Sequence, residues 1–190
     1  KRYGEKVYSN GFKVYTTIRK QHQEAANDAV IQGIINFELR HGFRGAEKVI
    51  SLPAGKMKAS EARELLRDFV TYNQFVPALV TKVEPNLLTL GTQRGTVLKL
   101  QDKAILLVKN HMPPAKKTPL SLAPGAVIRV YQQNDSWMVV QLPEVESGFI
   151  ALNPETGQVN ALIGGFSFQR NKYNHVTQGR RQPGSSFKPF

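Results

Sequence analysis

The residues with the clearest chemical potential are Ser185 and Lys188, which form a Ser-x-x-Lys pattern directly after a Pro-Gly pair. Residues three apart lie on the same face of a helix, so a helix that begins near Ser185 brings the two side chains together. In that arrangement Lys188 can take the proton of the Ser185 hydroxyl and turn a weak nucleophile into an acylating one. The spacing therefore predicts a serine acyl-transfer site, with Lys188 as the general base.

The pattern alone is loose, because 26 Lys and Arg residues make chance matches frequent. Its surroundings strengthen it. Gly184 permits a turn and Ser185 falls where a helix would begin, so the Ser185 backbone N–H can form half of an oxyanion hole. A lysine acts as a base only when it is neutral, and burial and a cationic neighbour favour that form. Ser186 is the residue most easily mistaken for the nucleophile, but only Ser185 stands three positions before a lysine.

Two short apolar strands are predicted upstream, within residues 147–165, around an Asn-Pro-Glu-Thr-Gly turn. Proline at the second turn position and a nearby glycine fit a type I hairpin turn with a following bulge. From residue 165 to 190 the chain has five Lys or Arg and no Asp or Glu. The functional interpretation of this bias is a field that attracts carboxylate-bearing ligands. For any single one of these residues, a place on a solvated loop face is the preferred interpretation.

Residues 151–190 resemble the opening of the transpeptidase domain of class A penicillin-binding proteins of the 1A type. These are bifunctional glycosyltransferase/transpeptidases that build bacterial peptidoglycan, and Ser-x-x-Lys is a motif of this family. Residues 11–18 look like the strand that leads out of the glycosyltransferase domain. The resemblance rests on four motifs in order: Asn-Pro-x-Thr-Gly-x-Val from Asn153, Gly164-Gly165, Tyr173-Asn174, and Arg-Gln-Pro-Gly-Ser-x-x-Lys-Pro from Arg181.

The resemblance implies that Ser185 attacks the penultimate D-alanine of a stem peptide and passes the acyl group to an amine of a neighbouring stem. It implies stem peptides, a lipid-linked precursor and β-lactams as ligands, and no cofactor. It also implies work at the periplasmic face of the bacterial inner membrane, with a single-pass anchor outside this chain. The family's Ser-x-Asn and Lys-Thr-Gly motifs are absent, and the Lys-Thr-Pro at 117–119 is no substitute. We therefore expect a piece of a longer enzyme that is inactive alone.

Two amphipathic helices are predicted in the first third of the chain. The first covers roughly residues 19–40, with Thr16 or Thr17 as its cap and Gly42 as its stop. The second begins at Ser60. The expected apolar stripes are Ala26, Val30, Gly33, Ile34 and Phe37 in the first helix, and Ala62, Leu65, Leu66 and Phe69 in the second.

From residue 74 to 141 the apolar period changes to two, which predicts about six short strands and an OB-like barrel. The expected strands are 75–83, 87–90, 95–100, 104–108, 126–132 and 137–141. The predicted fold is therefore α+β in three parts. A helical linker region occupies 1–72, an OB-like accessory β domain 73–142, and the first hairpin and nucleophile helix of a transpeptidase domain 143–190.

The formal net charge of +12 predicts an anionic partner or surface. The alternative to a cell-wall synthase is a basic OB-fold nucleic-acid-binding protein. Stacking platforms need outward aromatic side chains, however, and residues 86–130 contain no Phe, Tyr or Trp, so we expect no nucleic acid. Trp137 fits core packing better than ligand stacking. The barrel, with its basic Pro-rich stretch at 111–117, is instead a candidate docking surface for a periplasmic or outer-membrane regulator.

Composition narrows the remaining possibilities. The absence of cysteine excludes disulfides and thiolate metal sites, but it fits a periplasmic protein as well as a cytosolic one. The histidines, at 22, 41, 111 and 175, have no ligand spacing, so we predict no metal. No apolar run is long enough to span a membrane.

Overall fold

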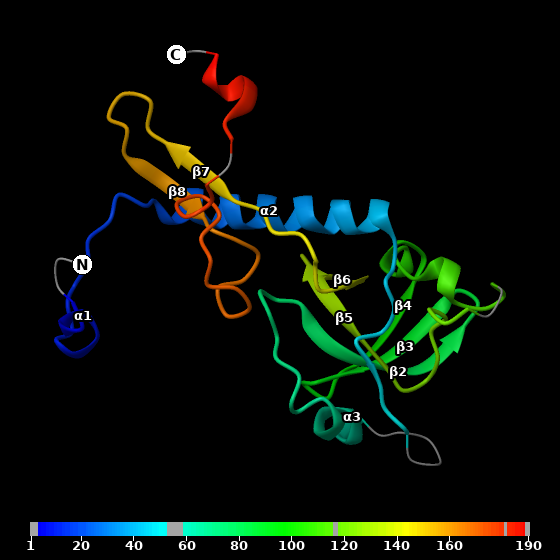
Figure 1. Ribbon diagram of the computed structural model, residues 1–190. Helices are drawn as coiled ribbons and strands as arrows, with labels where there is room; N and C mark the ends of the chain where they lie inside the picture. Colours follow the sequence, from blue (N-terminus) through cyan, green and yellow to red (C-terminus); the bar gives the residue numbers. More distant parts are fainter. Residues whose placement is uncertain (1–3, 53–58, 116–117, 181, 189–190) are drawn as a thin grey trace.

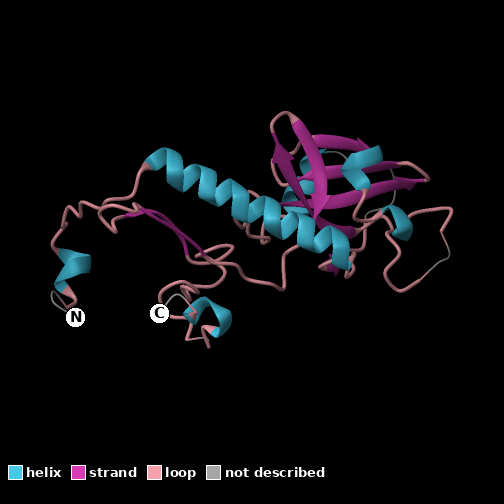
Figure 2. Cartoon of the chain, turned by 90° about the horizontal axis from the view of Figure 1, so that it is seen from above, coloured by secondary structure: helices cyan, strands magenta, loops and turns pink. Residues whose placement is uncertain are grey.

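The computed structural model describes residues 4–52, 59–115, 118–180 and 182–188. A curved six-stranded sheet, a long helix and a separate two-stranded hairpin make up its main parts (Figure 1). The sheet lies beside the C-terminal half of the long helix, and the hairpin lies beside the N-terminal half (Figure 2). The mixture of helix and sheet agrees with the predicted α+β class.

The long helix is α2 (Lys20–His41), and it agrees closely with the predicted range. Its buried residues are Ala26, Val30, Ile31, Ile34, Ile35 and Glu38. Gly42, at φ 85°, ends the helix as predicted, and its N–H donates to Glu38 O. Two expectations were wrong. Gly33 is exposed rather than part of the buried stripe, and Arg19 occupies the N-cap position because the Thr17 hydroxyl donates instead to Val159 O, at 2.7 Å.

The short helix α3 (Ala59–Leu65) covers one end of the sheet. Ser60 was expected to cap this helix, but it lies within it, because the helix already includes Ala59. A helical turn near the start of the chain, α1 (Lys6–Ser9), stands apart. Ala62 and Leu66 are fully buried, as the predicted stripe requires, and they pack with Leu79 and Val127. The approach is close, since a Cβ atom at Gly91 would lie 2.5 Å from that of Ala62. Glycine at this position lets α3 lie directly on the sheet.

The barrel consists of β1 (Lys48–Val49), β2 (Val76–Glu84), β3 (Leu87–Thr92), β4 (Val97–Gln101), β5 (Ala126–Gln133) and β6 (Ser136–Val140). The strand order is β1-β5-β2-β3-β4, with β6 also paired to β5, and all pairs are antiparallel. One apolar core fills its interior, including Val80, Leu90, Ile128 and Val130. Five of the six predicted strands are confirmed, with ends that differ by up to two residues.

The predicted strand at 104–108 is wrong. The chain there forms two 3-10 helices, η1 (Asp102–Ile105) and η2 (Lys109–His111), with turns between them. Ile105, Val108 and Met112 are buried at helical spacing, whereas Leu106 is exposed. A short apolar run fits a strand and a helix equally well, so periodicity could not decide.

The strand β1 and the residue Phe43, both between α2 and β2 in the chain, also belong to the barrel, although the sequence placed them in the linker region. β1 pairs with β5 through Lys48–Val127 and Val49–Ala126. Phe43 is buried in the barrel core. A two-residue strand has too few positions to show a period, so β1 could not have been predicted.

A polar joint holds the barrel against the end of α2. The buried Glu38 carboxylate accepts from the Gln141 amide and pairs with Arg44, both at 2.5 Å. Gln141 also donates to Gly42 O, and its own carbonyl oxygen accepts from the Arg44 N–H at 3.0 Å. The segments that enter and leave the barrel are thereby tied to each other and to the helix.

The hairpin of β7 (Phe149–Leu152) and β8 (Val159–Ile163) has the predicted form. The Asn153 side chain accepts from the N–H groups of Glu155 and Thr156, both at 2.9 Å, and Gly157 has φ 69°. A register shift next to Leu152 marks the bulge. The strand expected at 11–18 is absent from the described chain: these residues have no regular structure, and Val14 and Tyr15 are exposed.

Candidate functional site

Ser185 and Lys188 share one turn of 3-10 helix, η3 (Gly184–Phe187), which follows Pro183. Gly184 has φ 54°, a backbone conformation that glycine adopts without strain. The Lys188 N–H donates to Ser185 O at 3.2 Å. The sequence therefore placed both residues on one turn correctly, although the described part of the predicted nucleophile helix is only this turn.

Ser185 and Lys188 are both exposed. The turn that carries them is the red segment of Figure 1. No hydrogen bond joins the Ser185 hydroxyl to the Lys188 amine in the described ranges. The burial expected around Lys188 is therefore absent from the described part of the chain. The turn places the two residues one 3-10 turn apart and leaves both exposed to solvent.

The loop between β8 and this turn is ordered by Asn174. Its side-chain oxygen accepts from the N–H groups of Val176 and Thr177, at 3.0 and 3.1 Å. Its own N–H donates to the side chain of Gln178 at 2.7 Å. A Cβ atom at Gly164 would lie 2.8 Å from Asn174 Cγ, so glycine is needed for this approach. Two of the recognised motifs, Gly164-Gly165 and Tyr173-Asn174, thus meet in the structure.

Glu146 holds the start of the same loop. Its carboxylate accepts from the Phe166 N–H at 2.7 Å, and the Asn73 amide donates to Phe166 O, also at 2.7 Å. A Cβ atom at Gly165 would lie 2.9 Å from Glu146 Oε2. The sequence analysis missed Glu146, because a side chain bound to a backbone group 20 positions away leaves no local pattern.

The basic residues of the loop have different surroundings. Arg170 donates to Pro143 O at 2.5 Å and so has a structural role. Lys172, Arg180 and Lys188 are exposed. The expected attractive field can therefore come from these three cations, while Arg170 also ties the loop to the segment that leaves the barrel.

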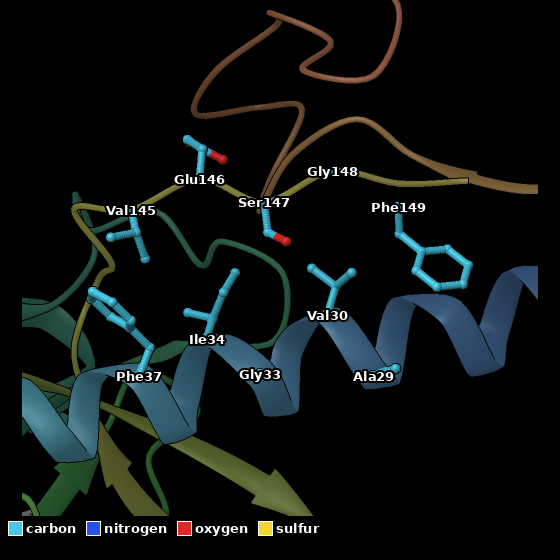
Figure 3. Close-up of a pocket in the computed structure, with 10 residues that line it drawn as sticks. All are labelled: Ala29, Val30, Gly33, Ile34, Phe37, Val145, Glu146, Ser147, Gly148 and Phe149. Atoms are coloured by element: carbon cyan, nitrogen blue, oxygen red, sulfur yellow. The ribbon is translucent and has the colours of Figure 1, made fainter. Parts of the chain in front are cut away.

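An apolar groove of about 510 Å³ runs beside the hairpin (Figure 3). One wall is the face of α2 that carries Val30, Ile34 and Phe37, and the other is the segment 145–149. Gly33 lies in the α2 wall, and a Cβ atom there would meet no atom within 4 Å. The groove extends from the barrel end of α2 to the start of β7.

Within the described ranges, no group of three or more His, Asp or Glu side chains could hold a metal ion. The same ranges contain no helix that is both long and apolar enough to cross a membrane.

Comparisons with known proteins show which family shares this sequence and fold. The model of the penicillin-binding protein OB-like domain family matches residues 43–145, more than half of the chain. Over its whole length the chain is 34% identical to penicillin-binding protein 1A of Escherichia coli and 38% identical to that of Pseudomonas aeruginosa. The chain belongs to the penicillin-binding proteins of the 1A type. It spans about a quarter of these relatives, since it covers 23% of each.

A crystal structure of penicillin-binding protein 1A from Haemophilus influenzae is similar in fold, with a TM-score of 0.75 and 29% identity. The match covers 94% of this chain and 26% of that one. The resemblance to penicillin-binding proteins of the 1A type and the predicted OB-like domain are thus confirmed. Membership of this family favours a cell-wall protein over the nucleic-acid-binding alternative. The domain boundaries after residues 72 and 142 stay predictions; the family match begins at residue 43, before β1.

Proposed function

We propose that this chain is the accessory barrel and the start of the transpeptidase domain of a peptidoglycan synthase, with Ser185 as its acyl-ester nucleophile. The observation that carries the proposal is the turn 184–188, which presents Ser185 and Lys188 together in a chain of this family. The ordered loop before the turn supports it, because the recognised motifs there contact each other.

The proposed reaction is acyl transfer. Lys188 takes the hydroxyl proton while Ser185 Oγ attacks the carbonyl carbon of the penultimate D-alanine of a donor stem peptide. The oxyanion is stabilised by the Ser185 N–H and by a second donor from outside this chain. The amide C–N bond breaks, and the nitrogen of the terminal D-alanine takes up one proton, the equivalent of the one removed from Ser185, as it leaves. An amine of a neighbouring stem then attacks the ester, which forms the cross-link and frees Ser185.

The same nucleophile explains inhibition by β-lactams. The lactam amide mimics the D-Ala-D-Ala amide. Attack by Ser185 opens the lactam ring and leaves Ser185 as a stable ester. The exposed Lys172 and Arg180 precede the turn in sequence and add positive charge to this part of the chain, which favours ligands that carry a carboxylate. The longer protein would also polymerise glycan strands from a lipid-linked precursor, would be anchored at the periplasmic face of the inner membrane, and would offer its barrel to a regulator.

Covalent labelling of the longer protein with a fluorescent penicillin tests the nucleophile. Ser185→Ala should abolish labelling and leave the fold intact, because it removes one exposed oxygen. Ser186→Ala is the matched control and should label fully. Lys188→Met should slow acylation by roughly 10²–10⁴-fold, the usual contribution of a general base. Full labelling of Ser185→Ala would move the nucleophile to another residue, with Ser186 as the first to test.

A further inference from the structure

The barrel has an open seam between β4 and β6. Among the residues that the structure describes, β4 pairs with β3 alone and β6 with β5 alone, so each strand keeps one free edge. A groove of about 760 Å³ follows this seam. Its walls are β4, the start of η1 and the turn into β6, that is, residues 97–104 and 135–138. Here the OB-like barrel lacks the hydrogen bonds that would close it.

The free backbone groups of β4 lie in this seam. The Thr92 N–H donates to Thr96 O at 2.9 Å, which makes these residues a hydrogen-bonded pair at the end of the β3–β4 ladder. Such pairs alternate along an antiparallel ladder, so Leu98 and Leu100 also bond to β3. The N–H and C=O groups of Lys99 therefore point away from β3 and into the seam.

The side chains around the groove divide into an apolar floor and a charged rim. Leu98 and Leu100 are buried in the barrel core, and the half-buried Trp137 packs against the same core while it lines the groove. Lys99 and Lys103 are exposed on the rim. Asp135 also lines the groove, at the turn into β6.

Of the two carboxylates near these lysines, Asp102 already accepts from the Asn86 amide at 2.9 Å. Neither lysine has a carboxylate within salt-bridge distance among the described residues, in contrast to Lys82, which pairs with Glu84 at 2.9 Å. Lys99 and Lys103 are thus available to an acidic partner.

We propose that the seam binds an extended segment of a partner protein as an added β-strand, with an acidic side chain opposite Lys99. The backbone of such a strand would pair with the free groups of β4. Residues on either side of the acidic one would point inward and pack on Trp137, because side chains alternate along a strand. The partner motif is therefore apolar–acidic–apolar.

Lys99 determines which strands the free edge of β4 can pair with. A lysine in the middle of a free strand opposes pairing with a second copy of the same strand, since two lysines would lie close together. The same charge favours an acidic strand by cross-strand attraction. The inference rests on the proposed docking of a regulator on the barrel, and it adds the edge and the chemistry of the partner segment. It does not depend on the proposed acyl transfer, since the seam and the turn at 184–188 lie on different parts of the chain.

The sole tryptophan makes binding directly measurable, because Trp137 lines the groove. The probe is a blocked heptapeptide in which valine and glutamate alternate, titrated to about 1 mM against the 190-residue chain. We expect a saturable blue shift of Trp137 emission. The same peptide with lysine in place of glutamate should bind weakly, and so should an acidic peptide N-methylated at alternate residues, which cannot pair with an edge.

Lys99→Glu should weaken the acidic peptide about tenfold or more and strengthen the lysine peptide. Lys20→Glu is the matched control, because it makes the same charge change on an exposed position of α2 and should leave both affinities unchanged. Thermal unfolding would verify that both variants fold. The proposal is overturned if the acidic peptide does not bind, if Lys99→Glu or N-methylation leaves its affinity unchanged, or if a single-stranded oligonucleotide shifts the emission while the peptide does not.

Discussion

At the scale of single residues, Arg129 on β5 holds two segments that are far from it in sequence. Only 2% of its side chain is exposed, and it forms a two-point pair with Glu47 at 2.5 and 2.8 Å. It also donates to Val70 O and Phe75 O and lies over the ring of Tyr72. One buried cation thus joins the linker before β1 to the turn before β2.

Replacement of this cation should cost much of the stability of the barrel. Arg129→Met keeps the volume but leaves the Glu47 carboxylate and two backbone carbonyls without their donor. We expect the free energy of unfolding in urea to fall by about 2–4 kcal/mol, somewhat less than for a fully buried pair because Glu47 keeps 27% exposure. Arg94→Met, at an exposed position, is the control. Equal losses in the two variants would show that the Arg129 pair contributes nothing.

Two glycines should respond to alanine in opposite directions. At Gly33 a Cβ atom meets nothing within 4 Å, and helical alanine is favoured over glycine, so Gly33→Ala should raise the free energy of unfolding by about 0.5–1 kcal/mol. At Gly164 the Cβ atom would lie 2.8 Å from Asn174 Cγ, so Gly164→Ala should lower it by about 1–3 kcal/mol. Urea unfolding midpoints measure both, and shifts of the same sign would contradict the packing described.

The sequence could indicate a functional or structural role only for residues whose partners are close to them in the chain. Ser185, Lys188 and the Gly164-Gly165 pair belong to short motifs whose members are close in sequence. Arg129 and Glu47 are 82 positions apart, and nothing in either neighbourhood signals the other. The roles of such residues depend on the fold and had to be read from the structure.

At the scale of elements, α2 completes one edge of the hairpin. The Gln23 side chain donates to Leu162 O and accepts from the Leu162 N–H, both at 2.9 Å, as a neighbouring strand would. The Arg19 N–H donates to Asn160 O at 2.9 Å. Ile150 and Leu152, on the other strand of the hairpin, remain exposed.

Removal of the Gln23 side-chain amide should expose the backbone groups of Leu162 on β8 to solvent. Gln23→Ala leaves both backbone groups of Leu162 without a partner, so hydrogen exchange at the Leu162 amide should accelerate about tenfold, the equivalent of 1–2 kcal/mol. Gln21→Ala, on the exposed face of α2, is the matched control and should not change it. An unchanged Leu162 rate in Gln23→Ala would mean that packing on α2, not this amide, holds β8.

The elements also show where sequence patterns carry information. A period of two located the five longer barrel strands, and the Asn-Pro-Glu-Thr-Gly turn located the hairpin. The pattern failed at 104–108, where an apolar run forms 3-10 turns, and at 11–18, where an extended segment has no partner strand. Strand formation needs a neighbour as well as a pattern, and the neighbour is set by the whole fold.

At the scale of the whole molecule, the barrel and the hairpin are held on opposite ends of one helix. The joint of Glu38, Arg44 and Gln141 fixes the barrel end, and Gln23 with the β8 contacts fixes the other. The turn with Ser185 and Lys188 lies beyond the hairpin and is exposed. This arrangement fits the proposal that the acyl-transfer site is completed by the rest of a longer protein.

Mass spectrometric mapping after reaction with benzylpenicillin tests this account most directly. In the longer protein we expect one penicilloyl group per molecule, located on Ser185. The 190-residue chain should form no adduct under the same conditions, because it lacks the second oxyanion donor, whose loss alone costs about 10²–10³ in rate. An adduct on any other residue of the longer protein, or a penicilloyl ester on the 190-residue chain, would contradict the account.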